Sequence, residues 1–156
     1  MSAFELAQLN IAQMRTPLDS PEMADFVANL DRINALAESF AGFVWRLQDE
    51  AGNATAPRPM GESTLVNISV WRDVAALREF VYKSAHVEIM RRRREWFDAM
   101  EQASMVLWWV PAGHRPDESE AVAKLALLRA QGPSPEAFTF RQPYAAPDAE
   151  SASISP

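Results

Sequence analysis

The sequence predicts a single α+β domain with elements in the order β-α-β-β-α-β, followed by one more helix and a short strand. Three observations carry this prediction. Some segments have apolar residues at alternate positions, which is typical of strands, and others have them at three- and four-residue spacing, which is typical of helices. Proline- and glycine-containing stretches separate these segments. The length of 156 residues fits one domain with a tail.

Composition excludes several classes of function. The chain has no cysteine, which excludes disulfides, thiolate metal sites and cysteine catalysis. Its formal net charge is −6, which argues against nucleic acid or an anionic membrane as partner. No signal-peptide pattern and no apolar run of about 20 residues is visible, so we expect a cytoplasmic protein without a membrane partner.

Alternating or β-rich segments predict strands at residues 6–14, 43–49, 64–71 and 104–110. Ser20 is expected to cap a helix running to Phe40, and Asp73 is expected to cap a second one. Further helices are expected over residues 85–100 and over residues 117–131, where Asp117 begins a capping-box pattern. Residues 50–63 are expected to form a loop, and 138–140 a short edge strand. The domain should span residues 1–143, with a flexible tail at 144–156.

This element order is the ferredoxin-like one, in which both long helices cover one face of the sheet. The other face would then expose apolar and aromatic residues, among them one of Trp108 and Trp109. A face of this kind is larger than soluble monomers usually expose, so the sequence predicts a homodimer. The rival explanation is that the last helix covers this face within one chain.

Several segments resemble one bacterial family. They are residues 9–12, 67–71, 80–86 with Arg93, Trp96 and Phe97, 108–114 and 135–140. Together they resemble the DUF3291 family, within the dimeric α/β-barrel superfamily, over residues 5–141. The superfamily also includes antibiotic-biosynthesis monooxygenases, haem-degrading monooxygenases and muconolactone isomerases. The resemblance implies a dimer with a pocket between sheet and helices, and it leaves the reaction open.

His86 is the leading candidate for chemistry. On a continuous helix it would share an apolar stripe with Met90, Arg93 and Phe97, and Tyr82 lies four residues before it. Within a pocket, His86 would be the acid–base group, Arg93 would stabilise an anion or enolate, and Tyr82 would position the substrate. The alternative is structural, with His86 bonded to a backbone carbonyl and Arg93 to a helix end or a partner's carboxylate.

Further candidates lie on sheet faces or in a loop. Buried amides and hydroxyls on a sheet face must find partners, and a ligand can be that partner. Tryptophans more often belong to a core or an interface, but two of them are kept as candidates for ligand contact. The candidate substrate-binding residues are Asn10, Asn67, Ser69, Trp96, Trp109 and His114.

The leading hypothesis is a small-molecule enzyme or ligand-handling protein that takes an apolar or aromatic compound. Its reaction would be cofactor-independent oxygenation or acid–base isomerisation or cyclisation of an aromatic or polyketide-like substrate. No cofactor is predicted, and two isolated histidines predict no metal site. Haem binding or haem breakdown is one alternative, and a non-enzymatic, stress-related binding module is the other.

Overall fold

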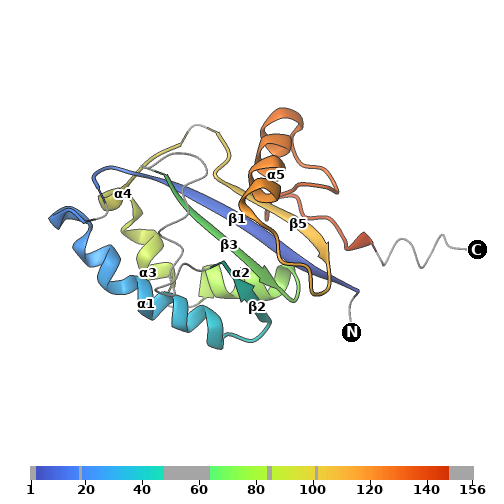
Figure 1. Cartoon of the computed structure of the whole chain (residues 1–156), viewed down its shortest axis with the longest axis horizontal. Coiled ribbons are helices and arrows are strands. Elements are labelled where there is room, and N and C mark those ends of the chain that lie inside the picture. The colour runs from blue at the N-terminus through green and yellow to red at the C-terminus, as the bar shows by residue number, and fades with distance from the viewer. Residues whose placement is uncertain (1–2, 18, 48–63, 84–85, 101, 148–156) are drawn as a thin grey trace, which may run out of the picture.

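The computed structural model describes residues 3–17, 19–47, 64–83, 86–100 and 102–147 (Figure 1). Along the chain lie β1 (Phe4–Met14), the short 3-10 helix η1 (Pro21–Met23), α1 (Ala24–Ser39), β2 (Phe43–Arg46), β3 (Thr64–Trp71), α2 (Val74–Lys83), α3 (His86–Arg91), α4 (Arg93–Trp96), β4 (Phe97–Asp98), β5 (Met105–Pro111) and α5 (Glu118–Gln131).

The strands form one antiparallel sheet with β1 at its centre. β3 pairs with one edge of β1, and β2 pairs with the outer edge of β3. The other edge of β1 pairs with β5 along most of its length and with β4 at its end. The order β2-β3-β1-β5 confirms the predicted ferredoxin-like sheet.

Strand register decides which side chains share a face. Leu9 pairs with Ile68, and Gln8 pairs with Ser69. Because side chains alternate along a strand, the first pair lies on one face and the second pair on the other. The Gln8 face is covered by α1, α2 and α3, which lie together on one side of the sheet in Figure 1.

The opposite face is covered within the same chain by α5. Ala121, Leu125 and Leu128 of this helix are buried in one cluster with Leu9 and Ile68. The premise that this face has no cover within the chain is therefore wrong, because α5 lies on it. Among the described residues, α5 and this face of the sheet therefore form one buried cluster within a single chain.

Two of the three expected helix caps form. Asp73 Oδ1 accepts a hydrogen bond of 2.8 Å from the Ala76 backbone N–H. Asp117 Oδ1 accepts one of 2.8 Å from the Glu120 N–H at the start of α5. Ser20 makes no cap, because its hydroxyl is already engaged in the preceding turn with Thr16 and with the carbonyl of residue 17.

The helix predicted over residues 85–100 is wrong in its second half. The chain leaves the helix at Arg92, makes the single turn α4, and becomes extended at Phe97 with φ −131° and ψ 145°. Phe97 then pairs with Met14 at the end of β1. The apolar spacing fits a helix equally well, but the free edge of β1 beyond β5 offers backbone partners that a continued helix would leave unpaired.

The C-terminal segment also differs in detail from expectation. Residues 138–140 form no regular strand, and Phe138 makes one isolated bridge with Leu107. Tyr144, expected in the tail, packs on Phe138 with ring centroids 5.7 Å apart. Its backbone carbonyl also accepts a 2.9 Å hydrogen bond from Trp109 Nε1. The predicted tail from residue 148 onward, and the loop predicted at 50–63, lie outside the described residues.

Candidate functional site

A cavity of about 590 Å³ lies between the Gln8 face of the sheet and the helices that cover it. β1 and β3 form its floor, α1 and α2 form its walls, and residues of α3 and α4 close one side. Polar side chains of the two central strands, Gln8 on β1 and Asn67 and Ser69 on β3, face this space beneath the helices.

The cavity has a buried end and an open end. Trp71, Phe80 and Ala37 line it where the chain is buried. Asn10 and Asp98 line it and are exposed to solvent. A ligand would therefore enter near the end of β1 and move toward Trp71.

Apolar and aromatic side chains form most of the cavity wall. Phe80 and Trp71 lie with ring centroids 5.2 Å apart at the buried end. Phe26 and Phe97 meet edge-on at 5.1 Å nearer the opening. Met90 lies among them on α3. Aromatic and thioether groups of this kind suit a flat, apolar ligand, because they offer large contact area and adapt in shape.

A polar ledge crosses the floor of the cavity and consists of Gln8, Asn67 and Ser69. Gln8 Nε2 donates to Asn67 Oδ1 at 2.7 Å and to Ser69 Oγ at 2.8 Å. Trp71 Nε1 donates to the same Ser69 Oγ at 2.9 Å. Gln8 and Ser69 are only 3% and 5% exposed, so these groups are fixed in an environment that excludes most water.

The ledge is incompletely paired by the protein. Among the described residues, nothing donates to Gln8 Oε1, and Asn67 Nδ2 and the Ser69 hydroxyl hydrogen find no acceptor. Exchanging the oxygen and nitrogen positions in the side-chain amides of both Gln8 and Asn67 would preserve the bond between them. It would again leave one donor and one acceptor without a partner. Buried polar groups are almost always paired, so this ledge has the hydrogen-bonding capacity that a ligand would use.

Arg46 brings a buried cation to the cavity from β2. It is 7% exposed, and its Nε donates to Glu38 Oε2 of α1 at 2.7 Å. Asn34, also on α1 and buried, lines the same space. The ion pair fixes α1 against the edge of the sheet and offsets most of the charge that Arg46 would otherwise bring.

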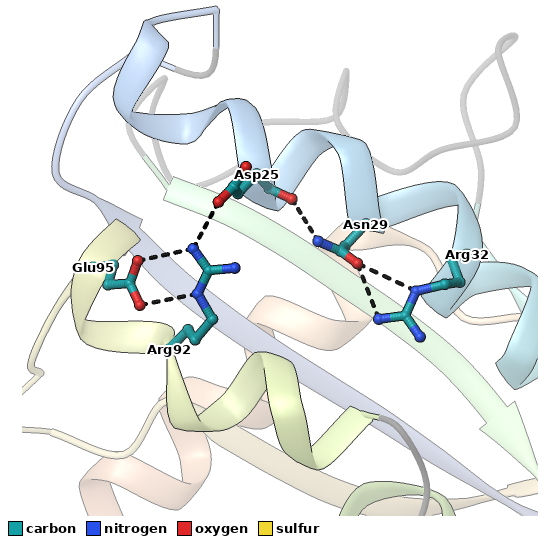
Figure 2. A network of polar contacts seen from close by, with 5 residues as sticks. All are labelled: Asp25, Asn29, Arg32, Arg92 and Glu95. Atoms are coloured by element: carbon teal, nitrogen blue, oxygen red, sulfur yellow. Dashed lines mark hydrogen bonds and ion pairs between the residues drawn. The ribbon is translucent and has the colours of Figure 1, made fainter.

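A network of polar contacts links α4 to α1 beside the opening (Figure 2). The Arg92 guanidinium lies between two carboxylates, donating to Asp25 at 2.8 Å and to both oxygens of Glu95 at 2.9 Å. Hydrogen bonding to Glu95, and then to Asp25, raises the pKa of Arg92 above its ordinary value. The same bonds from Arg92 lower the pKa of Glu95. Arg92 also stacks over Trp96 at 4.7 Å, so it holds α4 in place against α1.

Four of the predicted site residues line this cavity. Asn67 and Ser69 belong to the ledge, and Asn10 and Arg93 lie at the opening. Met90 and Phe97, which were expected on one helical stripe with Arg93, also line it, although the chain breaks between them.

The other predicted residues lie elsewhere. Tyr82 is 53% exposed, packs on Phe140 at 5.7 Å and does not line the cavity. Trp96 is buried against Phe26 next to the cavity wall. Trp109 belongs to the Phe138 and Tyr144 cluster.

His114 lies away from the cavity, at the α5 end of the molecule. Its Nε2 is 2.6 Å from Glu120 Oε1, while the other oxygen of Glu120 accepts from Trp108. His86 is the first residue of α3, but its side chain lies outside the described residues. The expected trio of Tyr82, His86 and Arg93 therefore has one member at the cavity, one away from it and one undescribed.

Sequence reasoning left Gln8, Asn34, Arg46 and Arg94 off the candidate set, and all four line the cavity. Gln8 carried a usable signal, because a polar residue between Leu6 and Asn10 on the same strand face is unusual in a central strand. Among the described residues, no group of three or more histidine, aspartate and glutamate side chains could hold a metal ion. No helix in the described part is long and apolar enough to cross a membrane.

The family model for DUF3291, a domain of unknown function, matches residues 5–154. The chain belongs to this family. No curated protein matches the DUF3291 chain. The family match therefore assigns the chain to a family but not to a reaction.

Solved structures of similar layout have low sequence identity to this DUF3291 protein. SnoaB of Streptomyces nogalater, described as a cofactor-independent oxygenase, is 18% identical with a TM-score of 0.48, over 74% of this chain and 100% of that one. PA3566 of Pseudomonas aeruginosa is 15% identical with a TM-score of 0.47, over 73% and 98%. A putative antibiotic biosynthesis monooxygenase of Chloroflexus aurantiacus is 10% identical with a TM-score of 0.44, over 72% and 97%.

Proposed function

We propose that this DUF3291 protein binds a small, mainly apolar molecule in the cavity and orients it through the polar ledge. The observation that carries the proposal is the Gln8 side-chain amide, which is only 3% exposed and has one polar atom, Oε1 in the orientation described, without a partner among the described residues. A buried carbonyl without a donor costs about 1–3 kcal/mol, and a ligand donor would remove this cost.

The ledge defines the polar part of the ligand. It offers one amide acceptor, one amide donor and the Ser69 hydroxyl, all uncharged. A hydroxyl, amine, amide or carbonyl group on an aromatic or aliphatic ring would match it. The aromatic wall would hold the ring itself, and the volume of about 590 Å³ is within the range of ordinary small-molecule sites.

If the bound molecule is also transformed, the ledge contributes orientation and polarisation. Amide and hydroxyl groups do not exchange a proton near neutral pH, so Gln8, Asn67 and Ser69 are positioning groups. Proton transfer would need a titratable group, and His86, at the start of α3, is the proposed acid–base residue. Oxygenation or isomerisation of an aromatic substrate remains the proposed reaction class, with Arg93 as the proposed stabiliser of an anion.

The binding proposal is tested with N-phenyl-1-naphthylamine, a neutral aromatic probe whose N–H can donate to Gln8 Oε1. Its fluorescence should rise on binding, and Gln8→Met should weaken binding about three- to tenfold, the effect of one hydrogen bond. Gln131→Met, at an exposed position of α5, is the matched control. Absence of binding to the wild-type chain, or equal binding by Gln8→Met, refutes the proposal.

The catalytic part has a separate test. Wild type and His86→Ala are compared for turnover of hydroxylated naphthalenes and anthracenones, with probe binding measured in parallel. Loss of turnover with unchanged binding supports His86 as the acid–base residue. Equal turnover by both removes it from the mechanism, and a Soret shift on addition of haem would favour the haem-binding alternative.

We also propose that the chain forms a homodimer, which the family resemblance supports. An uncovered sheet face does not require a dimer, because α5 covers that face. Sedimentation equilibrium at low micromolar concentration tests the proposal. A species of 17.4 kDa is a monomer and refutes it, and twice that mass supports it.

A further inference from the structure

Two arginines at the opening of the cavity have no carboxylate partner in the part of the chain that the structure describes. Arg93 and Arg94, on α4, line the cavity and are exposed. The Arg93 guanidinium donates to the Met90 carbonyl at 2.7 Å. Among the described residues, neither side chain forms an ion pair. Arg92, their neighbour, bonds two carboxylates.

The other charges on the cavity wall are already offset. Arg46 pairs with Glu38 at 2.7 Å. Asp98, the only acidic residue among the described lining residues, pairs with Arg15 at 3.7 Å. Beside the opening, Arg92 with its two carboxylates leaves one negative charge, against the two positive charges of Arg93 and Arg94. The opening therefore carries a net positive charge, in a chain whose formal net charge is −6. A local charge opposite to that of the whole molecule steers ligands of matching sign to one place on its surface.

We infer that the ligand carries an anionic group, and that Arg93 and Arg94 hold it at the opening while its apolar body lies in the cavity. The inference rests on the proposed function, since it concerns the same cavity. A guanidinium presents several N–H donors in one plane, which matches a carboxylate or sulfonate. The ligand class is an amphipathic organic anion: an aromatic or aliphatic body, an uncharged hydrogen-bonding group for the ledge, and a charged end near solvent.

The geometry separates the two kinds of recognition. The ledge is buried and suits an uncharged group, because an anion moved there would lose its hydration, and the nearby cation Arg46 is already paired with Glu38. Arg93 and Arg94 are exposed, so an anion held there keeps part of its water and loses affinity as salt is added. A ligand bound in this way would have its charged end at α4 and its uncharged end beside Ser69.

Two probes with the same aromatic body test the inference. 1-Anilinonaphthalene-8-sulfonate carries the sulfonate that N-phenyl-1-naphthylamine lacks, and both have the N–H group. Arg93→Gln combined with Arg94→Gln should weaken binding of the sulfonate probe about three- to tenfold and change binding of the neutral probe less than about twofold. Added salt should weaken only the sulfonate probe, and each probe should displace the other.

The control keeps the same change in net charge at positions outside the cavity. Arg91→Gln combined with Arg141→Gln alters two exposed arginines that do not line it. If Arg93 and Arg94 do not bind the anionic group, the two double variants bind the sulfonate probe equally. That result overturns the inference and leaves the proposed function intact. If neither probe binds the wild type, or Gln8→Met weakens neither, the proposed function fails instead.

Discussion

Replacing Gln8 by methionine is expected to weaken ligand binding while leaving the free energy of unfolding nearly unchanged. The substitution removes the bonds from Nε2 to Asn67 at 2.7 Å and to Ser69 at 2.8 Å. At about 1 kcal/mol each, their loss costs about 2 kcal/mol. It also removes the unpaired carbonyl oxygen, which gains about 1–3 kcal/mol, and the thioether fills a similar volume. The expected net change is within about 1 kcal/mol.

Ser69→Ala provides the contrast. The Ser69 hydroxyl accepts from both Gln8 and the buried Trp71 indole, so the alanine variant leaves Trp71 Nε1 without its acceptor. We expect a loss of about 1–3 kcal/mol, larger than for Gln8→Met. Urea denaturation followed by tryptophan fluorescence measures both variants, and unchanged m-values would show that the unfolded states are comparable.

The result that would refute this reasoning is a loss of more than about 3 kcal/mol for Gln8→Met in the absence of ligand. A loss of that size would show that the Gln8 carbonyl is already paired in the free protein. The ledge would then be a structural network that holds β1 to β3, and its unpaired groups could not be assigned to a ligand.

Three further substitutions test the packing and the electrostatics. Leu125→Ala should destabilise the chain by about 2–5 kcal/mol in urea denaturation, because Leu125 is buried between α5 and the sheet; a smaller loss would mean that α5 covers the sheet loosely. Gly42→Ala should cost at least about 1–2 kcal/mol, since φ is +91° and an added Cβ would collide with Ala76; a neutral effect would contradict this turn geometry. Glu95→Gln should lower the urea midpoint at pH 7. Because Arg92 lowers the pKa of Glu95, the contribution is present above the ordinary value of about 4.3 and is lost as the pH falls through the lowered pKa. The two midpoints should therefore converge in acid, and a difference that persists there would exclude the ion pair as its cause.

The sheet was predictable because its strands carry strong local signals. Residues 64–71 alternate and are β-rich, and the structure has β3 at the same bounds. The capping aspartates Asp73 and Asp117 were also predictable, since a short side chain before an apolar run needs only local geometry to cap a helix.

The break near Arg92 could not be read from the sequence. Met90, Arg93 and Phe97 have helical spacing, and nothing local favours a strand at Phe97. The strand at Phe97 forms because it pairs with Met14, more than eighty residues earlier in the chain. Met14 lies at the end of β1 that β5 does not reach. Pairings over such separations depend on the whole sheet, so local patterns do not reveal them.

Part of the site was predictable from local alternation in the sequence. Asn67 and Ser69 were identified because polar residues alternate with apolar ones on β3. Arg94 was missed, because its position at the opening depends on the turn at Arg92. Tyr82 was placed at the site by helical spacing from His86, but α2 ends at Lys83 and the spacing does not continue through to α3.

The central position of β1 has a consequence for synthesis of the chain. β1 is made first, yet its two long neighbours are made much later, as β3 and β5. A nascent chain therefore carries an apolar strand with both edges open until β3 has emerged, and with one edge open until β5 has emerged at residue 111; α5 follows only after that. Open edges of this kind invite pairing with other chains, so ribosome-bound intermediates should need chaperone protection for most of the time of translation. Stalled or truncated products ending before β5 should therefore aggregate.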